Sequence, residues 1–263
     1  MTRPKLGDAG DLEKTEDLVP MAEGSFAEAK ESYAIATYSK RFGVGRQAII
    51  NDDLSAFDSI PALLGTAARR LVSKLFYDLL ISASGVGPTM AEDSLAIFAT
   101  THTSGANYTA GTGAPDVTGL AVALKLLRRQ KGFASAGETA PILNIQPAFL
   151  LVPAALEVAA RQAVESIGDP SKSNSITVNP FSSMLSVITE PRLDDATNGG
   201  TAWYVVATPA SIAGAEVAFL NGQEAPTTFR VEGTNVLGVE MAVVSDVGVK
   251  FVEHRGWYRC RGA

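Results

Sequence analysis

The chain has 263 residues, of which 46% are apolar and 19% are charged, and its formal net charge is −6. This length allows one large domain or two smaller ones with a sizeable core, and the mild acidity argues against tight duplex recognition, which needs a basic surface. Cys260 is the single cysteine, no uninterrupted apolar stretch could span a membrane, and no apolar signal segment opens the chain, so we expect a soluble protein made in a cytoplasm.

The first fifty residues look unable to form a core of their own. Residues 1–16 are charged and aperiodic, which predicts a flexible N-terminal arm, and residues 17–50 are polar and glycine-dotted. Within them, the alternating run 32–38 predicts a strand, and a second β-like run is expected over 46–50. An arm that cannot bury itself usually lies on another molecule. This pattern indicates an assembling protein rather than an enzyme.

A long helix is the best-defined element of the sequence. Asn51, Asp52 and Asp53 form a cluster suited to capping a helix N-terminus. Apolar pairs then recur every four residues up to Leu80, which predicts a helix over 61–84 with a wide apolar stripe. Gly85 and the following glycine-proline pair are expected to end it. Such a rod is long for a compact α/β enzyme.

The rest of the chain separates helices from strands. A loop region is expected over 89–115, a helix over 117–131 capped by Asp116 or Thr118, a β-like run over 142–152, and a helix over 153–167. Beyond residue 175 the pattern is mostly β, with strands predicted over 184–188, 203–207, 216–220, 228–231, 239–244 and 247–252. This segregation favours an α+β fold over a doubly wound sheet.

One short run of the chain is strongly basic, Arg128-Arg129-Gln130-Lys131. It falls at the end of the helix predicted over 117–131, where cations complement the helix dipole and cap carbonyls. A nucleic-acid patch is the alternative interpretation. A single cluster of this size does not support tight duplex binding.

Few residues could carry catalysis. His102 lies in a loop among hydroxyls, where an ordinary hydrogen-bonded surface group is the plain interpretation, and a hydrolase using His102 with Ser104 is the alternative. His254 is expected to pair with Glu253 or to pack on Trp257. The sequence has no metal-ligand spacing and no phosphate-loop motif. We therefore predict no catalytic, cofactor or metal site.

Four stretches resemble, in the same order, segments of the major capsid proteins of tailed phages. They cover residues 38–80, 93–107, 143–162 and 218–259, and the motifs RQAIINDDL and HRGWY are the most specific. The similarity extends over most of the chain from about Leu18 onward. The nearest group is the Mu-type major head subunits, some of which are fused behind a prohead protease.

The resemblance implies an α+β fold of the HK97-like capsid type. Its parts would be an N-terminal arm at 1–16, an extended loop at 17–50, a peripheral domain at 51–140 around the long spine helix, an axial domain at 141–241, and a strand returning to the peripheral domain at 242–263. No long charged helical pattern precedes Leu18. Scaffolding would then be a separate protein, or the chain is already mature.

The implied function is that of a major capsid protein, which self-assembles into pentamers and hexamers of an icosahedral shell around double-stranded DNA. Loops at the capsomer centre would include Asn198, Gly199 and Gly200. The extended loop would lie across a neighbouring subunit through Phe26, Lys30, Tyr33, Ile35, Tyr38 and Lys40. Lys30 and Lys40 are also the only loop candidates for covalent cross-linking, and no signature supports them.

The resemblance also implies partners and a location. The partners would be other copies of the chain, a scaffolding protein, a prohead protease, a portal, a decoration protein and non-specifically held DNA, with no membrane. The protein would be a structural component of the virion, assembled in the host cytoplasm, with no enzymatic activity and no cofactor. An encapsulin-like nanocompartment shell, or a minor head or tail structural protein, is the alternative.

Overall fold

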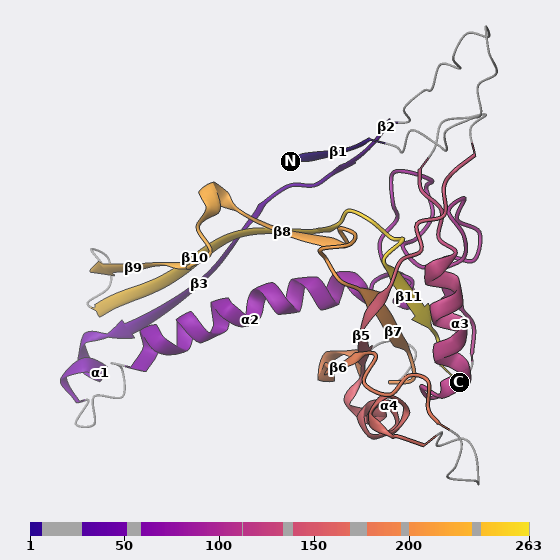
Figure 1. Ribbon diagram of the computed structural model, residues 1–263. Coiled ribbons are helices and arrows are strands. Elements are labelled where there is room, and N and C mark those ends of the chain that lie inside the picture. The colour runs from indigo at the N-terminus through magenta and orange to yellow at the C-terminus, as the bar shows by residue number, and fades with distance from the viewer. Residues whose placement is uncertain are drawn as a thin grey trace, which may run out of the picture. The chain divides into compact units, whose positions relative to one another are not determined.

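The computed structural model describes residues 1–6, 28–51, 59–111, 113–133, 139–168, 178–195, 200–232 and 238–262. The chain divides into two compact units, and Figure 1 shows its elements. The first unit comprises Met1, Tyr33–Asp78 and Glu216–Lys250. The second comprises Thr2–Ser32, Leu79–Ala215 and Phe251–Ala263.

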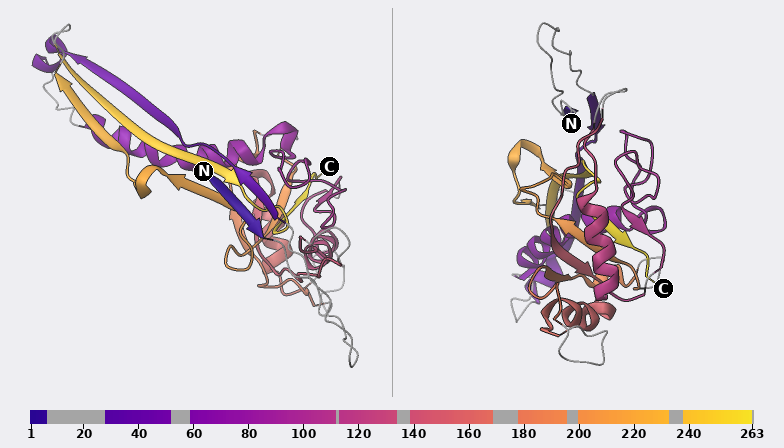
Figure 2. Two further views of the ribbon diagram at one scale, coloured as in Figure 1. Left: turned by 90° about the horizontal axis from the view of Figure 1, so that it is seen from above. Right: turned by 45° about the vertical axis from the view of Figure 1, so that its right-hand side comes forward.

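The first unit is a four-stranded sheet with a long helix. Strand β10 is the centre of the sheet, pairing antiparallel with β3 along one edge and with β9 along the other, in the order β3-β10-β8 with β9 beside β10. The strands are β3 (Ala36–Gly45), β8 (Ala215–Phe219), β9 (Thr227–Glu232) and β10 (Gly238–Phe251). The helices are α1 (Arg46–Ile50), α2 (Ile60–Leu80) and the single 3-10 turn η5 (Leu220–Gly222). Helix α2 runs beside the sheet in both Figure 1 and Figure 2.

The core of the first unit is thin. Its buried apolar side chains, among the described residues, are Val44, Leu64, Ala218, Val243 and Val247. Much of the apolar stripe of α2 is only half-buried, and Leu63 is 65% exposed. The helix predicted from periodicity is present, but few of its apolar side chains are removed fully from water within this chain.

The second unit contains a mixed five-stranded sheet of order β4-β11-β7-β5-β6. The two outer pairs, β4 with β11 and β5 with β6, are parallel, and the inner pairs are antiparallel. The strands are β4 (Tyr108–Thr109), β5 (Pro147–Val152), β6 (Ser186–Thr189), β7 (Trp203–Ala207) and β11 (Trp257–Cys260). The helical elements are η2 (Ala83–Gly85), α3 (Val117–Arg128), η3 (Ala154–Leu156), α4 (Glu157–Glu165) and η4 (Pro191–Leu193).

Helices α3 and α4 cover one face of this sheet. One row of neighbouring side chains crosses β5, β7 and β11 and consists of Leu150, Val205 and Tyr258. This row packs in one cluster with the apolar faces of both helices. Of the two caps predicted for α3, Asp116 or Thr118, the structure has Asp116, whose side chain accepts a hydrogen bond from the backbone N–H of Gly119. On the other face, Tyr204 packs against Phe98 of the preceding loop region. The second unit therefore has a full two-sided core, in contrast to the first.

The N-terminal residues are not a free arm. Thr2–Leu6 forms β1, which pairs antiparallel with β2 (Glu28–Ser32). Glu31 of β2 is buried and accepts a hydrogen bond of 2.6 Å from the backbone N–H of Ala91. The prediction of a flexible arm was wrong for residues 1–6, and residues 7–16 lie outside the described residues.

Several predicted boundaries also change. Residues 46–50 form helix α1 rather than a strand, because pairing with β10 stops at Gly45. The strand expected over 32–38 is interrupted at residues 33–35, and the two strands expected over 239–244 and 247–252 are one continuous β10. Asn51 follows α1, with its N–H bonded to the carbonyl of Gln47, so it does not cap α2, which begins at Ile60. Asp52 and Asp53 lie outside the described residues.

In the structure, residues 216–250 belong to the same compact unit as residues 33–78. The division implied by the resemblance instead placed residues 141–241 together in one axial domain. The five-part division itself stays a prediction. Within the described portion of the chain, no helix has both the length and the apolar character to cross a membrane.

Candidate assembly surface

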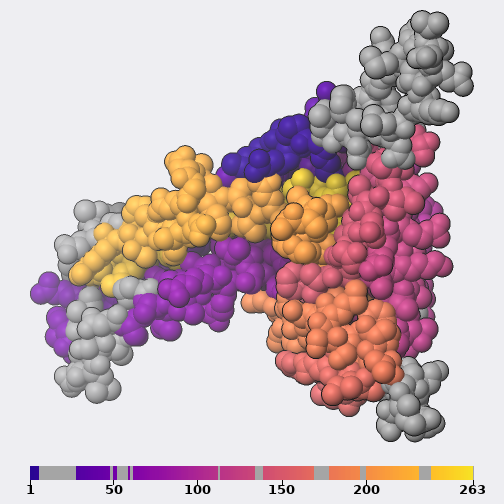
Figure 3. Space-filling view, in the orientation of Figure 1, coloured from indigo at the N-terminus to yellow at the C-terminus, as the bar shows by residue number. Residues whose placement is uncertain are grey.

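The sheet of the first unit presents apolar side chains on both faces. In the register of β10, Met241 lies beside Phe42 of β3, and the next residue, Ala242, lies beside Phe229 of β9. Because successive residues of a strand point to opposite faces, Phe42 and Phe229 are on opposite sides of the sheet. They are 46% and 50% exposed. Figure 3 shows β9 and β10, in yellow-orange, at the molecular surface.

Two polar pairs join β3 to β10 and leave Phe42 and Phe229 uncovered in the sheet of β3, β9 and β10, here called the ribbon. The hydroxyl of Thr37 donates to Asp246 at 2.5 Å, and Arg41 pairs with Glu240 at 3.4 Å. Both pairs are exposed to solvent, so each contributes little to stability. Among the described strands, β3 and β9 pair only with β10, so each leaves one backbone edge unpaired. An apolar, two-faced ribbon with open edges is suited to contact another molecule.

The residues predicted for the extended-loop interface are spread over two elements and a connecting segment. Lys30 is exposed on β2, and Lys40 is exposed on β3. Tyr38 is half-buried on the same face of β3 as Lys40. Tyr33 and Ile35 are half-buried in the segment between the strands, where Tyr33 exchanges backbone hydrogen bonds with Met1. Phe26 lies outside the described residues, and the role of this set in subunit contacts stays a prediction.

The predicted axial loop is described only at Gly200, because Asn198 and Gly199 lie outside the described residues. Gly200 has a φ of +69°, and a Cβ there would lie 3.0 Å from a carboxylate oxygen of Asp194. That carboxylate accepts hydrogen bonds from the N–H groups of Ala154 and Ala155. This close approach gives Gly200 a local structural role, and its place at a capsomer centre stays a prediction.

A buried ionic cluster in the second unit was not predicted from the sequence. Arg255 binds both carboxylates, donating to Glu92 and, at 2.7 Å, to Glu253. Lys5 of β1 lies 3.0 Å from Glu92 and 3.2 Å from Glu253. All four side chains are at most 14% exposed. The cluster joins the N-terminal strand to a loop and to the turn before β11.

The cluster holds both carboxylates ionised. Burial alone would raise the pKa of Glu92, but hydrogen bonds and positive charge from Arg255 and Lys5 outweigh burial and lower the pKa to about 2. Burial likewise opposes ionisation of Glu253, and the charges of Arg255 and Lys5 lower its pKa. These charge pairs replace the hydration that the groups lose on folding.

The two histidines lie together beside this cluster. The rings of His102 and His254 stack with their centroids 4.1 Å apart, and both residues are buried. Nδ1 of His102 is 2.5 Å from Asp93, and Nε2 of His254 is 2.8 Å from the hydroxyl of Ser104. The expectation of a surface histidine at position 102 was therefore wrong. No local pattern could reveal the stack, because the two rings come from distant parts of the chain.

The structure pairs Ser104 with His254, not with His102 as the hydrolase alternative required. A catalytic triad needs a carboxylate that is hydrogen-bonded to the histidine and orients it. Here Oε1 of Glu253 is 3.5 Å from Nδ1 of His254, and the same oxygen accepts a hydrogen bond from Arg255. Burial and the neighbouring His102 and Arg255 lower the pKa of His254 to about 4. Ser104 and His254 therefore form part of a buried hydrogen-bond network, and their geometry does not fit a serine activated by a histidine-carboxylate pair.

Two sets of these side chains have ligand atoms within 4.8 Å of one another: Asp93, His102 and His254, and Glu92, Glu253 and His254. In the second set both carboxylates are already bound by Arg255 and Lys5. Both ring nitrogens of His102 already have partners, Asp93 and the carbonyl of Ile97. Stacked rings also direct their lone pairs side by side, so one ion could bind both only if the rings separated. The described geometry fits hydrogen bonding better than metal coordination.

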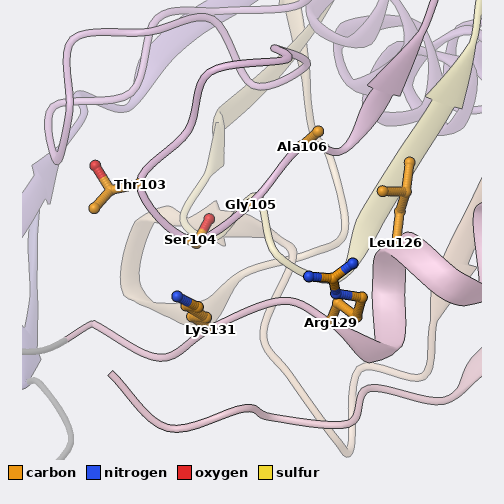
Figure 4. A pocket seen from close by; sticks show the side chains of 7 residues that line it. All are labelled: Thr103, Ser104, Gly105, Ala106, Leu126, Arg129 and Lys131. Carbon is orange, nitrogen blue, oxygen red and sulfur yellow. The ribbon is translucent and has the colours of Figure 1, made fainter. Parts of the chain in front are cut away.

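A pocket of about 340 Å³ opens next to Ser104 (Figure 4). It lies between the loop that carries the two hydroxyl residues and the C-terminal end of α3. Its lining residues are Thr103, Ser104, Gly105, Ala106, Leu126, Arg129 and Lys131. Two of them belong to the basic run noted in the sequence.

Comparison with known proteins adds a family and a fold. A family model described as phage capsid protein matches residues 28–260. A solved structure from Mycobacterium phage Patience is similar with a TM-score of 0.62 and 13% identity, covering 100% of this chain and 80% of that chain. The capsid asymmetric unit of cyanophage Pam1 is similar with a TM-score of 0.56 and 11% identity, covering 99% of this chain and 83% of that chain. The holo-encapsulin complex of Synechococcus elongatus is similar with a TM-score of 0.54 and 11% identity, covering 90% of this chain and 77% of that chain. A comparison with curated sequences found no match.

Proposed function

Because this chain belongs to the phage capsid protein family and is a major capsid shell protein of the virion with the HK97-like fold, we propose that its copies join through the sheet of β3, β9 and β10. The thin core of the first unit carries this proposal. Phe42 and Phe229 remain about half exposed on opposite faces of one sheet. Burying a fully exposed phenylalanine is favourable by roughly 1.5–3 kcal/mol, so covering the exposed half of each ring is favourable by about half of that.

The proposed contact is heterologous: the ribbon of one copy lies on a different surface of the next. A contact of this kind forms a closed ring when the rotation from one subunit to the next is a whole-number fraction of a full turn. Rings of five and six subunits would then pack together into a shell. Many weak contacts act together in such an assembly, so no single contact needs to be strong. Tyr33, Ile35 and Tyr38, which are half-buried in the isolated chain, would complete their burial there.

The remaining partners follow from the same role. Packaged double-stranded DNA would be held without sequence preference, and scaffolding protein, prohead protease, portal and decoration protein would act during or after assembly in the host cytoplasm. The protein would have no enzymatic activity. Membership of the Mu-type subgroup is part of this proposal.

Electron microscopy of the negatively stained protein after size exclusion tests the proposal. Closed shells, or rings of five and six subunits, are the expected result. A protein that stays monomeric at every salt concentration, and also with a scaffolding protein and a prohead protease added, would overturn it.

An encapsulin-like shell is the second candidate, because the Synechococcus encapsulin shares the fold across 90% of this chain. The contents of the particles separate the two. Nuclease-protected DNA inside particles produced with the packaging machinery supports the capsid function. A specifically enclosed enzyme without DNA supports the compartment.

A further inference from the structure

We propose that the pocket between residues 103–106 and the end of α3 binds a phosphate group. It is lined by two hydroxyl side chains, Thr103 and Ser104, and two cationic ones, Arg129 and Lys131. In Figure 4 the side chains of Lys131 and Arg129 both lie below the segment that carries Ser104 and Gly105, with Lys131 nearer to Ser104 and Arg129 towards Leu126. The volume, about 340 Å³, is at the small end of the range of ligand pockets.

The two cations are not needed to complete the end of α3. The N–H of Gln130 bonds to the carbonyl of Leu127, and the N–H of Arg129 bonds to that of Lys125. The side-chain amide of Gln130 binds the carbonyls of Gly105 and Ala106. Backbone N–H groups thus bind the carbonyls of Lys125 and Leu127 at this helix end. Among the described residues neither the guanidinium of Arg129 nor the ammonium of Lys131 binds a carbonyl of α3, so hydrogen bonding to the helix end does not account for these two side chains.

The cations also lack anionic partners within the part of the chain that the structure describes. No ion pair is formed there by Arg129 or Lys131, although the adjacent Arg128 binds Gln146 at 3.1 Å. The carboxylates behind the pocket are engaged elsewhere: Glu92 and Glu253 by Arg255, and Asp93 by His102. The positive charge at the pocket is thus available to a ligand.

Ser104 supplies a fixed hydroxyl at the inner wall of the pocket. The residue is 3% exposed, and its oxygen lies 2.8 Å from Nε2 of His254. A hydroxyl has one donor hydrogen and two acceptor lone pairs, so Ser104 can accept from His254 and donate to a ligand at the same time. The position of the hydroxyl is held by the buried histidine stack and does not depend on the ligand.

This donor set fits phosphate better than carboxylate. A carboxylate is planar and is matched by the guanidinium fork of one arginine. A phosphate has more oxygens pointing in different directions, and it therefore suits a pocket whose lining offers a guanidinium, an ammonium and hydroxyl groups. The same chemistry is present in free phosphate and in the backbone of a nucleic acid. The proposal does not depend on shell formation, because binding can be measured on the unassembled chain.

Titration calorimetry of the purified full-length protein with inorganic phosphate at low salt tests the site. We expect saturable one-site binding that weakens at least about tenfold in Arg129→Gln and in Lys131→Gln, since hydrogen bonds to charged groups are the strong ones. Thr103→Val should weaken binding less. Arg128→Gln is the matched control, because it removes a charge from the same run outside the pocket and should leave the affinity within about twofold.

Absence of phosphate binding, or equal weakening by Arg128→Gln and Arg129→Gln, would overturn the proposal. Equal weakening would mean that phosphate is attracted by the overall positive charge of the helix end and does not bind at the pocket. Addition of a short DNA duplex separates the two sources of the ligand. If the duplex displaces phosphate in the parent and binds more weakly in Lys131→Gln, the ligand is the nucleic-acid backbone; if it does not displace phosphate, the ligand is free phosphate.

Discussion

Ser104 and His254 form a hydrogen bond of 2.8 Å in the interior of the second unit, and His254 stacks on His102. The pair connects the loop before β4 with the turn before β11. The pair brings the histidine stack to the pocket beside Ser104, and Arg255 of the ionic cluster reaches the same pocket by donating to the carbonyl of Lys131 at 2.8 Å. The consequences of this junction can be tested separately from assembly.

Stability should fall on mild acidification because of His254. Its pKa is lowered from 6.5 to about 4 in the folded chain. Between these values the unfolded chain binds a proton that the folded chain does not, so the free energy of unfolding decreases as pH falls from 6.5 towards 4. Denaturant unfolding of the unassembled protein at pH 7, 6 and 5 measures the slope. His254→Asn should flatten it, and an unchanged slope would show that His254 is not the group responsible.

Breaking the ionic cluster should destabilise the chain strongly. Arg255→Met leaves Glu92 and Glu253 with Lys5 as their one cation, and removal of one partner from a buried pair costs about 3–5 kcal/mol. Thermal unfolding of the unassembled chain measures the loss. Arg161→Met is the control, because Arg161 pairs with two glutamates on the exposed surface of α4, and its loss should lower the unfolding temperature much less. Equal shifts in the two variants would contradict this account.

Gly87 should not tolerate a side chain. Its φ is +77°, and a Cβ would lie 2.1 Å from Cγ2 of the buried Ile97. Gly87→Ala should therefore cost about 3 kcal/mol or more in the free energy of unfolding, from a left-handed backbone and an overpacked core. Gly113 has a similar φ of +78° but open space around it. Gly113→Ala should cost only about 1–2 kcal/mol, so similar losses at the two positions would rule out the steric explanation.

Assembly should depend on the two exposed phenylalanines. Phe42→Ser and Phe229→Ser should lower the yield of shells or rings while changing the unfolding free energy of the isolated chain by about 1 kcal/mol or less, because neither side chain is buried there. Particle yield by size exclusion, together with unfolding, gives both quantities. Phe42→Leu keeps an apolar group and should assemble. Normal yield in both serine variants would remove this sheet from the interface.

Point substitutions are better here than removal of the predicted extended loop. Residues 36–45 are the antiparallel partner of β10, so a deletion over 17–40 removes half of a strand from the sheet of the first unit. Such a deletion would test folding and assembly together. Strand β3 thus pairs with β10 through its backbone, although Val44 is its one buried residue, and the extended-loop assignment stays a prediction.

The sequence by itself determined the elements that depend on local pattern. Periodic apolar pairs predicted α2, and Asp116 marked the start of α3, because helix periodicity and capping act over a few residues. The short strands β7 and β9 were also located to within a residue. The strand prediction failed for α1, where Ile49 and Ile50 favour a strand but the three residues before them are good helix formers, and strand pairing ends at Gly45.

Only the tertiary structure decided which distant residues meet. Lys5, Glu92 and Arg255 are far apart in the chain, and each looks like an ordinary surface charge when read alone. The same holds for His102 and His254, whose burial follows from the docking of two loops and not from their neighbours in sequence. The cost of burying a polar group depends on the partner it finds, and a partner is set by three-dimensional packing, which local periodicity does not encode.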